Sequence, residues 1–159
     1  LYYNHLNTGR PLKEGKWFSK FTSNYLDIDN DPLYPFGYGL SYTTFKYGKP
    51  TLSSNTMTNN ETISVSVDIT NTGNYDADEI AQMYIRDLAA SVSRPVKELK
   101  GFERISIKKG ETKTVTFTIT PEDLKFYNQE LEYKNEPGEF EVMVGPNSKD
   151  VQTLTFTLK

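Results

Sequence analysis

The sequence contains no cysteine, which excludes disulfide bridges, thiolate nucleophiles and cysteine zinc sites together. This absence agrees with a reducing compartment and equally with a periplasmic or secreted bacterial domain, so it does not decide the location. No apolar run approaches the ~20 residues of a membrane-spanning helix. No phosphate-binding motif of the GxGxxG or GxxxxGK[ST] type occurs. The 21 acidic and 18 basic residues are scattered along the chain, which argues against a nucleic-acid or anionic-membrane partner.

Histidine is nearly as scarce as cysteine. The single residue, His5, falls in an irregular opening, so no Ser-His-Asp site can be placed on a strand scaffold, and we interpret it as a loop residue. The opening LYYNHLNTGRP has no initiating methionine, basic region or apolar segment of a signal peptide. We therefore expect the chain to be the interior of a longer protein.

What the sequence does have, from Ser41 onward, is alternation of apolar and polar residues. ISVSVDIT places four β-branched side chains on one face and polar side chains on the other, as in a half-buried strand. DEIAQMYIRD is apolar on both faces and predicts a central strand. PEDLKFYN predicts one helical turn with Thr120 as N-cap and Pro121 at its first position. Strands are predicted over residues 45–52, 63–70, 78–87, 96–107, 112–120, 139–145 and 153–159.

Seven short antiparallel strands predict an all-β, immunoglobulin-like or fibronectin type III-like sandwich over residues 43–159. The lack of cysteine favours the fibronectin type. A closed barrel is the rival, because alternation alone does not distinguish closure from two packed sheets. Residues 1–42 show no sustained period and predict an irregular N-terminal extension.

The stretch DPLYPFGYGLSY, residues 31–42, is unusually aromatic for an irregular segment. Its prolines stiffen the chain, and its glycines permit close backbone approach or positive φ. We predict that this junction segment is an adhesive surface that packs against a neighbouring domain. The residues assigned to this packing are Tyr34, Phe36, Gly37, Tyr38, Gly39, Leu40 and Tyr42.

The acidic residues are candidates for metal ligands and for catalytic groups. DIDND has the alternate acids of a calcium loop, but Pro32 stands where that loop needs glycine and Tyr38 where it needs glutamate. A glycosidase needs a carboxylate pair with shifted pKa values. The candidates lie in turns or at strand edges, where we expect ordinary pKa values. These candidates are Asp76, Asp78, Glu79, Glu130 and Glu132. No catalytic residue, metal or cofactor is predicted.

Two further features carry a binding interpretation and a structural one. Trp17 and the tyrosines could stack on sugars, although Trp17 is better explained as an anchor onto a neighbouring domain. The loop from Ala90 to Arg104 begins an edge-like strand at Pro95. Its basic residues discourage edge-to-edge pairing, and we prefer that function to ligand binding. They are Arg94, Lys97, Lys100 and Arg104.

Several motifs together resemble the C-terminal end of family 3 glycoside hydrolases, most closely the bacterial periplasmic β-glucosidase branch. The resemblance covers essentially the whole chain. It is carried by YYNHLNTGRP, FTSNYLDIDNDPLYPFGYGLSYTTF, NTGN, QMYIRDLAASVSRPVKELKGFERI and LKFYNQELEYKNEPGEFEVMVG.

The resemblance implies a fibronectin type III-like domain that follows an (α/β) barrel and an α/β sandwich, which hold the catalytic carboxylates. It implies that the junction segment crosses from the catalytic body into this domain, and that this chain has no catalytic residue. The parent enzyme would hydrolyse terminal β-D-glucosyl residues, or xylosyl residues as related β-xylosidases do, in the periplasm or outside the cell. The expected partners are the catalytic domains of the same chain, with carbohydrate or a second copy as alternatives. A carbohydrate-binding module is the alternative function.

Overall fold

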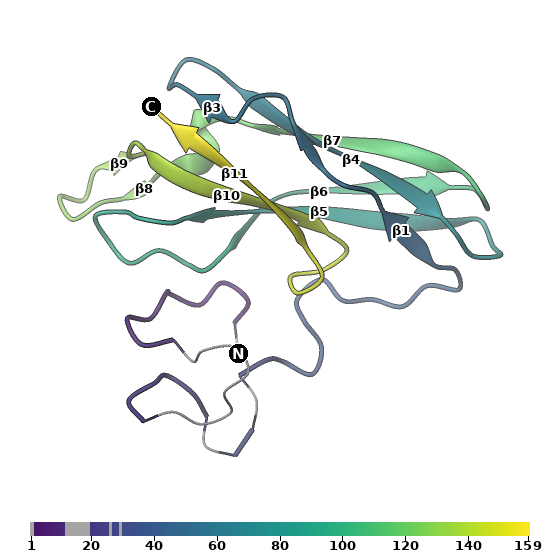
Figure 1. The fold of residues 1–159 in the computed structure, drawn as a ribbon, viewed down its shortest axis with the longest axis horizontal. Coiled ribbons are helices and arrows are strands. Elements are labelled where there is room, and N and C mark those ends of the chain that lie inside the picture. Colours follow the sequence, from purple (N-terminus) through teal and green to yellow (C-terminus); the bar gives the residue numbers. More distant parts are fainter. Residues whose placement is uncertain (1, 12–19, 26, 29) are drawn as a thin grey trace.

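The computed structural model of the protein describes residues 2–11, 20–25, 27–28 and 30–159. Residues from Phe45 onward form two packed β-sheets, and the described residues before Thr43 form an irregular leader on the side of β5 and β6 (Figure 1). Trp17 and Asp29, weighed above as an aromatic anchor and a calcium ligand, lie outside the described residues. Among the described residues, no helix has the length and apolar character that crossing a membrane requires.

The first sheet is built around β4 (Ile63–Asn71). It pairs with β7 (Thr112–Ile119) along one edge and with β1 (Phe45–Tyr47) and β2 (Thr51–Leu52) along the other. Apolar side chains of β4 and β7 alternate inward because successive residues of a strand point to opposite faces.

The second sheet has the order β3-β11-β10-β5-β6. Its bounds are β3 (Thr56–Met57), β5 (Ala77–Asp87), β6 (Glu98–Ile107), β10 (Gly138–Gly145) and β11 (Gln152–Leu158). All pairs are antiparallel except β3 with β11, and a register shift interrupts β5 and β6 at Met83/Tyr84. A hairpin of β8 (Phe126–Tyr127) and β9 (Tyr133–Lys134) completes the fold.

The core fills the space between the two sheets. Phe140 of β10 and Phe156 of β11 stack with ring centroids 5.5 Å apart, and both side chains are buried. They lie among the inward residues of β4, β5 and β7 in one contiguous cluster. The hydrophobic effect of this single core holds the sheets together.

A buried asparagine ties the sheets together at one end of the sandwich. Asn71 is fully buried, and its Oδ1 accepts hydrogen bonds from Thr43 Oγ1 (2.7 Å) and Gly73 N (3.1 Å). Its Nδ2 donates to the carbonyl oxygens of Tyr75 (2.8 Å) and Ile107 (3.0 Å). All four hydrogen-bonding positions of the amide are therefore used.

The predicted sandwich is confirmed, and the alternative of a closed barrel is wrong because the two sheets remain separate. The expected strand over residues 45–52 is two strands, separated at Gly48–Pro50. Proline lacks the N–H that a continuous ladder needs, and β1 and β2 pair with different parts of β4. The two-residue strands β3, β8 and β9 were not predicted.

The predicted helical turn is present as a short 3₁₀-helix, Pro121–Leu124, after the expected cap Thr120. The Thr120 backbone N–H donates to Asp123 Oδ2 at 2.8 Å, and the Thr120 hydroxyl donates to the same atom. The turn ends after four residues as the chain returns to extended conformation at Lys125.

Candidate functional site

The junction segment is fastened to the second sheet at its centre. The Phe36 carbonyl accepts a hydrogen bond from Ser148 N (2.9 Å) in the β10–β11 loop, and the Gly37 carbonyl accepts one from Gln82 Nε2 (3.3 Å) on β5. Gln82 Nε2 also donates to Pro146 O at 2.6 Å, so one amide joins the junction segment, β5 and the β10–β11 loop.

Aromatic rings of the leader cover the outer face of β5 beside this attachment. Tyr3 stacks on Phe36 with ring centroids 4.2 Å apart and meets Tyr84 edge-on at 5.8 Å. Tyr84 is completely buried although it points away from the core, and its hydroxyl donates to Gln82 Oε1. Burial raises the pKa of the Tyr84 phenol. The leader therefore forms a second, smaller layer on this sheet.

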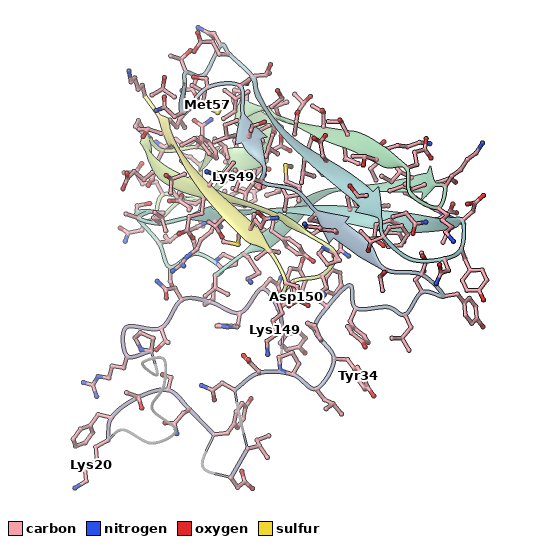
Figure 2. The ribbon with its side chains drawn as sticks, turned by 45° about the vertical axis from the view of Figure 1, so that its right-hand side comes forward. Lys20, Tyr34, Lys49, Met57, Lys149 and Asp150 are labelled. Carbon is pink, nitrogen blue, oxygen red and sulfur yellow. The ribbon has the colours of Figure 1, made fainter. Side chains whose placement is uncertain are left out.

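The other side chains of the junction segment remain exposed. The solvent-exposed fraction is 68% for Tyr34, 89% for Leu40 and 96% for Tyr42. Tyr34 projects away from the sandwich (Figure 2). Its ring tilts against that of Tyr38 with centroids 5.5 Å apart, and Tyr38 is half exposed. The junction segment is thus attached to the sandwich through Phe36 and Gly37, while its apolar side chains at Leu40 and Tyr42 face solvent.

The two glycines of the segment differ. Gly37 has φ +79°, and a Cβ there would lie 2.1 Å from Gln82 Oε1. Gly39 does not have a positive φ, and no atom would lie within 4 Å of its Cβ. Only Gly37 needs the conformational freedom that was predicted for both.

Replacing Gly37 by alanine is expected to detach the junction segment from β5. The left-handed conformation alone costs about 1–2 kcal/mol for an L-residue, and Gln82 is held in place by hydrogen bonds with Pro146 O and the Tyr84 hydroxyl. Hydrogen exchange of the Ser148 amide, which donates to Phe36 O, measures the loss of protection. Gly39→Ala is the matched control and should leave that protection unchanged. Equal exchange in the two variants would contradict this geometry.

The expectation that the candidate catalytic carboxylates keep ordinary pKa values is wrong for three of them, Asp78, Glu79 and Glu132. Glu79 does not keep an ordinary pKa: burial raises it, although Tyr47 of the opposite sheet donates to Oε1 at 2.8 Å and this hydrogen bond acts in the lowering direction. Hydrogen bonds lower the pKa of Asp78, chiefly from Ser106 and then Arg104. The pKa of Glu132 is lowered mainly by its hydrogen bond from Lys134. Asp78, Glu79 and Glu132 thus have their main contacts with different partners, and Glu132 also has a hydrogen bond with its neighbour Glu130.

Replacing Glu79 by glutamine is expected to raise the free energy of unfolding relative to the unchanged chain, more at pH 7 than at pH 4. The raised pKa favours the neutral carboxyl in the fold, so its stabilising effect is present below the unfolded pKa and is lost as pH rises through the folded pKa. Glutamine stays neutral and still accepts the Tyr47 hydrogen bond. Urea unfolding of the variant and of the unchanged chain across this pH range tests the prediction. If their free energies of unfolding differed by the same amount at every pH, the Glu79 carboxylate would not be a buried charge.

The remaining sequence candidates are engaged in ordinary surface contacts. His5 is exposed, and its Nδ1 lies 3.1 Å from Leu6 O. Asp31 forms an ion pair with Lys149 (2.7 Å), and Asp27 is exposed. Within the described residues, no group of three or more histidines or acids is placed to hold a metal ion.

The basic loop from Ala90 to Arg104 leads into β6, which is the edge strand that was expected. Several of its basic side chains are engaged in other contacts and are not available to discourage edge-to-edge pairing. Arg94 is largely buried, pairs with Glu98 at 2.7 Å and lies over the Phe126 ring. Arg104 pairs with Asp78. The leader forms an isolated antiparallel bridge between Leu6 and Pro95, just before β6 begins, so this contact lies beside the edge strand and not along it.

Sequence reasoning missed Gln82 as the attachment point. A single glutamine within the apolar run of β5 was the available signal, since a buried polar side chain needs partners. Nothing in the local pattern indicated that those partners come from Gly37 and Pro146.

Comparison with known proteins relates this architecture to a family. Residues 79–148 match the family "Fibronectin type III-like domain". A periplasmic β-glucosidase of Salmonella typhimurium is 53% identical over 99% of this chain, and a putative β-xylosidase of Formosa agariphila is 51% identical over 87%. The crystal structure of a β-glucosidase from Listeria innocua in complex with gluconolactone has a TM-score of 0.93 and 44% identity over 99% of this chain. The chain spans about a fifth of each relative: 20%, 18% and 22% of their lengths.

Proposed function

We infer that this chain, which carries a fibronectin type III-like domain, is a non-catalytic accessory domain of a family 3 glycoside hydrolase of the β-glucosidase type. Residues 43–159 form the sandwich, and residues 1–42 link it to the preceding catalytic body. Its role is to stabilise and orient the catalytic domains.

The observation that carries this proposal is the two-sided junction segment. Phe36 and Gly37 are bonded to the sandwich, whereas Leu40 and Tyr42 are almost fully exposed. An apolar cluster of this kind indicates a surface that another domain covers. Tyr34, Phe36, Tyr38 and Leu40 would each contribute about 1.5–3 kcal/mol if fully buried. This is sufficient to fix the orientation of two domains.

The activity of the whole protein follows from its relatives. We propose that the parent enzyme hydrolyses terminal β-D-glucosyl residues with retention of configuration and acts in the periplasm or outside the cell, as the name of the Salmonella relative indicates for that protein. The relatives named β-xylosidases make terminal xylose the second substrate to assay. The comparisons do not favour a carbohydrate-binding module.

Replacing Leu40 by serine in the full-length protein is expected to shorten the half-life of thermal inactivation about tenfold, since the lost burial is worth about 1.5 kcal/mol or more. The matched control is Leu131→Ser, because Leu131 is as exposed as Leu40, 81% against 89%, but lies in the β8–β9 hairpin. Activity against an aryl β-glucoside gives the readout.

In the 159-residue chain alone, both substitutions should change the free energy of unfolding by no more than about 0.5 kcal/mol. The selective effect in the full-length protein is therefore the signature of a domain contact. Equal half-lives for the two full-length variants would overturn the proposed function.

A further inference from the structure

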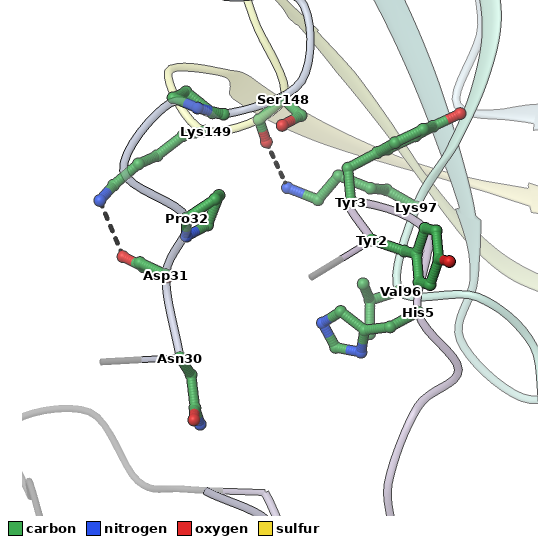
Figure 3. Close-up of a pocket in the computed structure, with 11 residues that line it drawn as sticks. Tyr2, Tyr3, His5, Asn30, Asp31, Pro32, Val96, Lys97, Ser148 and Lys149 are labelled. Atoms are coloured by element: carbon green, nitrogen blue, oxygen red, sulfur yellow. Dashed lines mark hydrogen bonds and ion pairs between the residues drawn. The ribbon is translucent and has the colours of Figure 1, made fainter. Parts of the chain in front are cut away.

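A pocket between the leader and the sandwich is lined by a lysine, Lys97, that has no ion-pair partner among the described residues. Lys97, in the segment before β6, is partly buried, and its Nζ donates to Ser148 O at 2.6 Å. Figure 3 shows this ammonium between the Asp31–Lys149 pair on one side and Tyr2, Tyr3 and His5 on the other. An ammonium has three N–H donors, and among the described residues Ser148 O is the hydrogen-bond acceptor of Lys97.

The carboxylates near Lys97 are paired with other cations. Glu141 lies 3.5 Å from Arg86, and Asp31 lies 2.7 Å from Lys149. No carboxylate of the described part of the chain lies within ion-pair distance of Lys97. Burial, and then the Arg86 charge, lower the pKa of Lys97 against weaker opposing effects of Asp31 and Glu141. The pocket therefore has an excess of positive charge at its centre.

Such a site favours an acidic ligand. Taking an ammonium out of water is costly unless an opposite charge and hydrogen bonds compensate it. A carboxylate supplies both, because its oxygens accept hydrogen bonds and its charge opposes that of Lys97. The walls formed by Tyr2, Tyr3 and Val96 would shield such a pair from water.

We propose that the pocket around Lys97 receives a carboxylate side chain from the catalytic body of the same protein, and that this ion pair fixes the register of the two domains. The inference rests on the proposed function. It is supported by continuity: Asp31, Pro32 and Pro35 of the junction segment line this pocket. The same segment thus supplies apolar contacts through its outward side chains and borders the charged site.

The test is the pKa of Lys97, measured in the full-length protein and in the 159-residue chain. Trace acetylation at a series of pH values, read by mass spectrometry of the peptide that contains Lys97, gives this value. A nearby carboxylate is expected to raise the measured pKa by about 1 or more in the full-length protein, which makes labelling at neutral pH about tenfold slower. Burial without a carboxylate would lower the pKa instead, so an unchanged or lowered value overturns the inference.

Two further arms test the role of the charge and the source of the carboxylate. In the full-length protein, Lys97→Met should shorten the inactivation half-life and Lys97→Arg should restore much of it; equal losses would overturn the role of charge. If excess acetate raises the pKa of Lys97 in the 159-residue chain as much as the full-length context does, a free acid is the ligand and the catalytic body is not. If Lys97 fails these tests while Leu40→Ser still acts selectively, the proposed function stands without this ion pair.

Discussion

Replacing Phe140 by alanine is expected to lower the free energy of unfolding of the 159-residue chain by about 3–5 kcal/mol. Phe140 is 1% exposed and stacks on Phe156 at the centre of the core, between β5 and β11. The truncation removes buried apolar surface and leaves a cavity that two paired strands cannot collapse into. Urea unfolding followed by circular dichroism measures the change.

Phe102→Ala is the matched control, because the same atoms are removed from a side chain that is 69% exposed on β6. Its effect should stay within about 0.5 kcal/mol. The urea dependence should be unchanged in both variants, since the surface exposed on unfolding is nearly the same. Comparable losses for the two phenylalanines would mean that the core does not lie between the sheets as described.

The second large effect is expected at Asn71. Asn71→Ala removes an amide that makes four buried or partly buried hydrogen bonds, and it leaves Thr43, Gly73, Tyr75 and Ile107 with unmatched groups. A buried group without a partner costs about 1–3 kcal/mol, so we expect a total loss of about 2–4 kcal/mol. The midpoint of urea unfolding reports it.

The neighbouring asparagine of the NTGN turn provides the comparison. Asn74 is exposed, and its Oδ1 accepts one hydrogen bond from Lys109 Nζ at 3.0 Å. Asn74→Ala should therefore be nearly neutral. If Asn71→Ala were equally mild, the network at this end of the sandwich would not hold the sheets together.

These two variants also separate folding from docking. Phe140 and Asn71 act within the sandwich, whereas Leu40 acts only where another domain is present. In the full-length protein, Phe140→Ala should destabilise the domain itself, while Leu40→Ser should leave the domain folded and weaken its attachment. Hydrogen exchange of the β10 amides distinguishes the two outcomes, since those amides are protected by pairing with β5 and β11.

The strands were predictable because alternation is a local property of the chain. In β4 and β7, each inward residue is two positions from the next, and this spacing alone assigns its face. The aromatic junction segment was also visible in the sequence, because its prolines, glycines and rings stand within twelve positions. The interdomain role of these residues stays a prediction.

The sequence by itself therefore determined which residues form the long strands and which faces these strands bury, and it marked residues 31–42 as an unusually aromatic segment. Only the tertiary structure decided the hydrogen-bond partners of Gln82 and Lys97 and the shifted pKa values of Glu79 and Lys97. Their properties depend on Gly37, Tyr47 and Ser148, which lie far away in the chain and reach them only when the sheets and the leader pack. Burial and charge compensation are set by such distant neighbours, so no local pattern contains them.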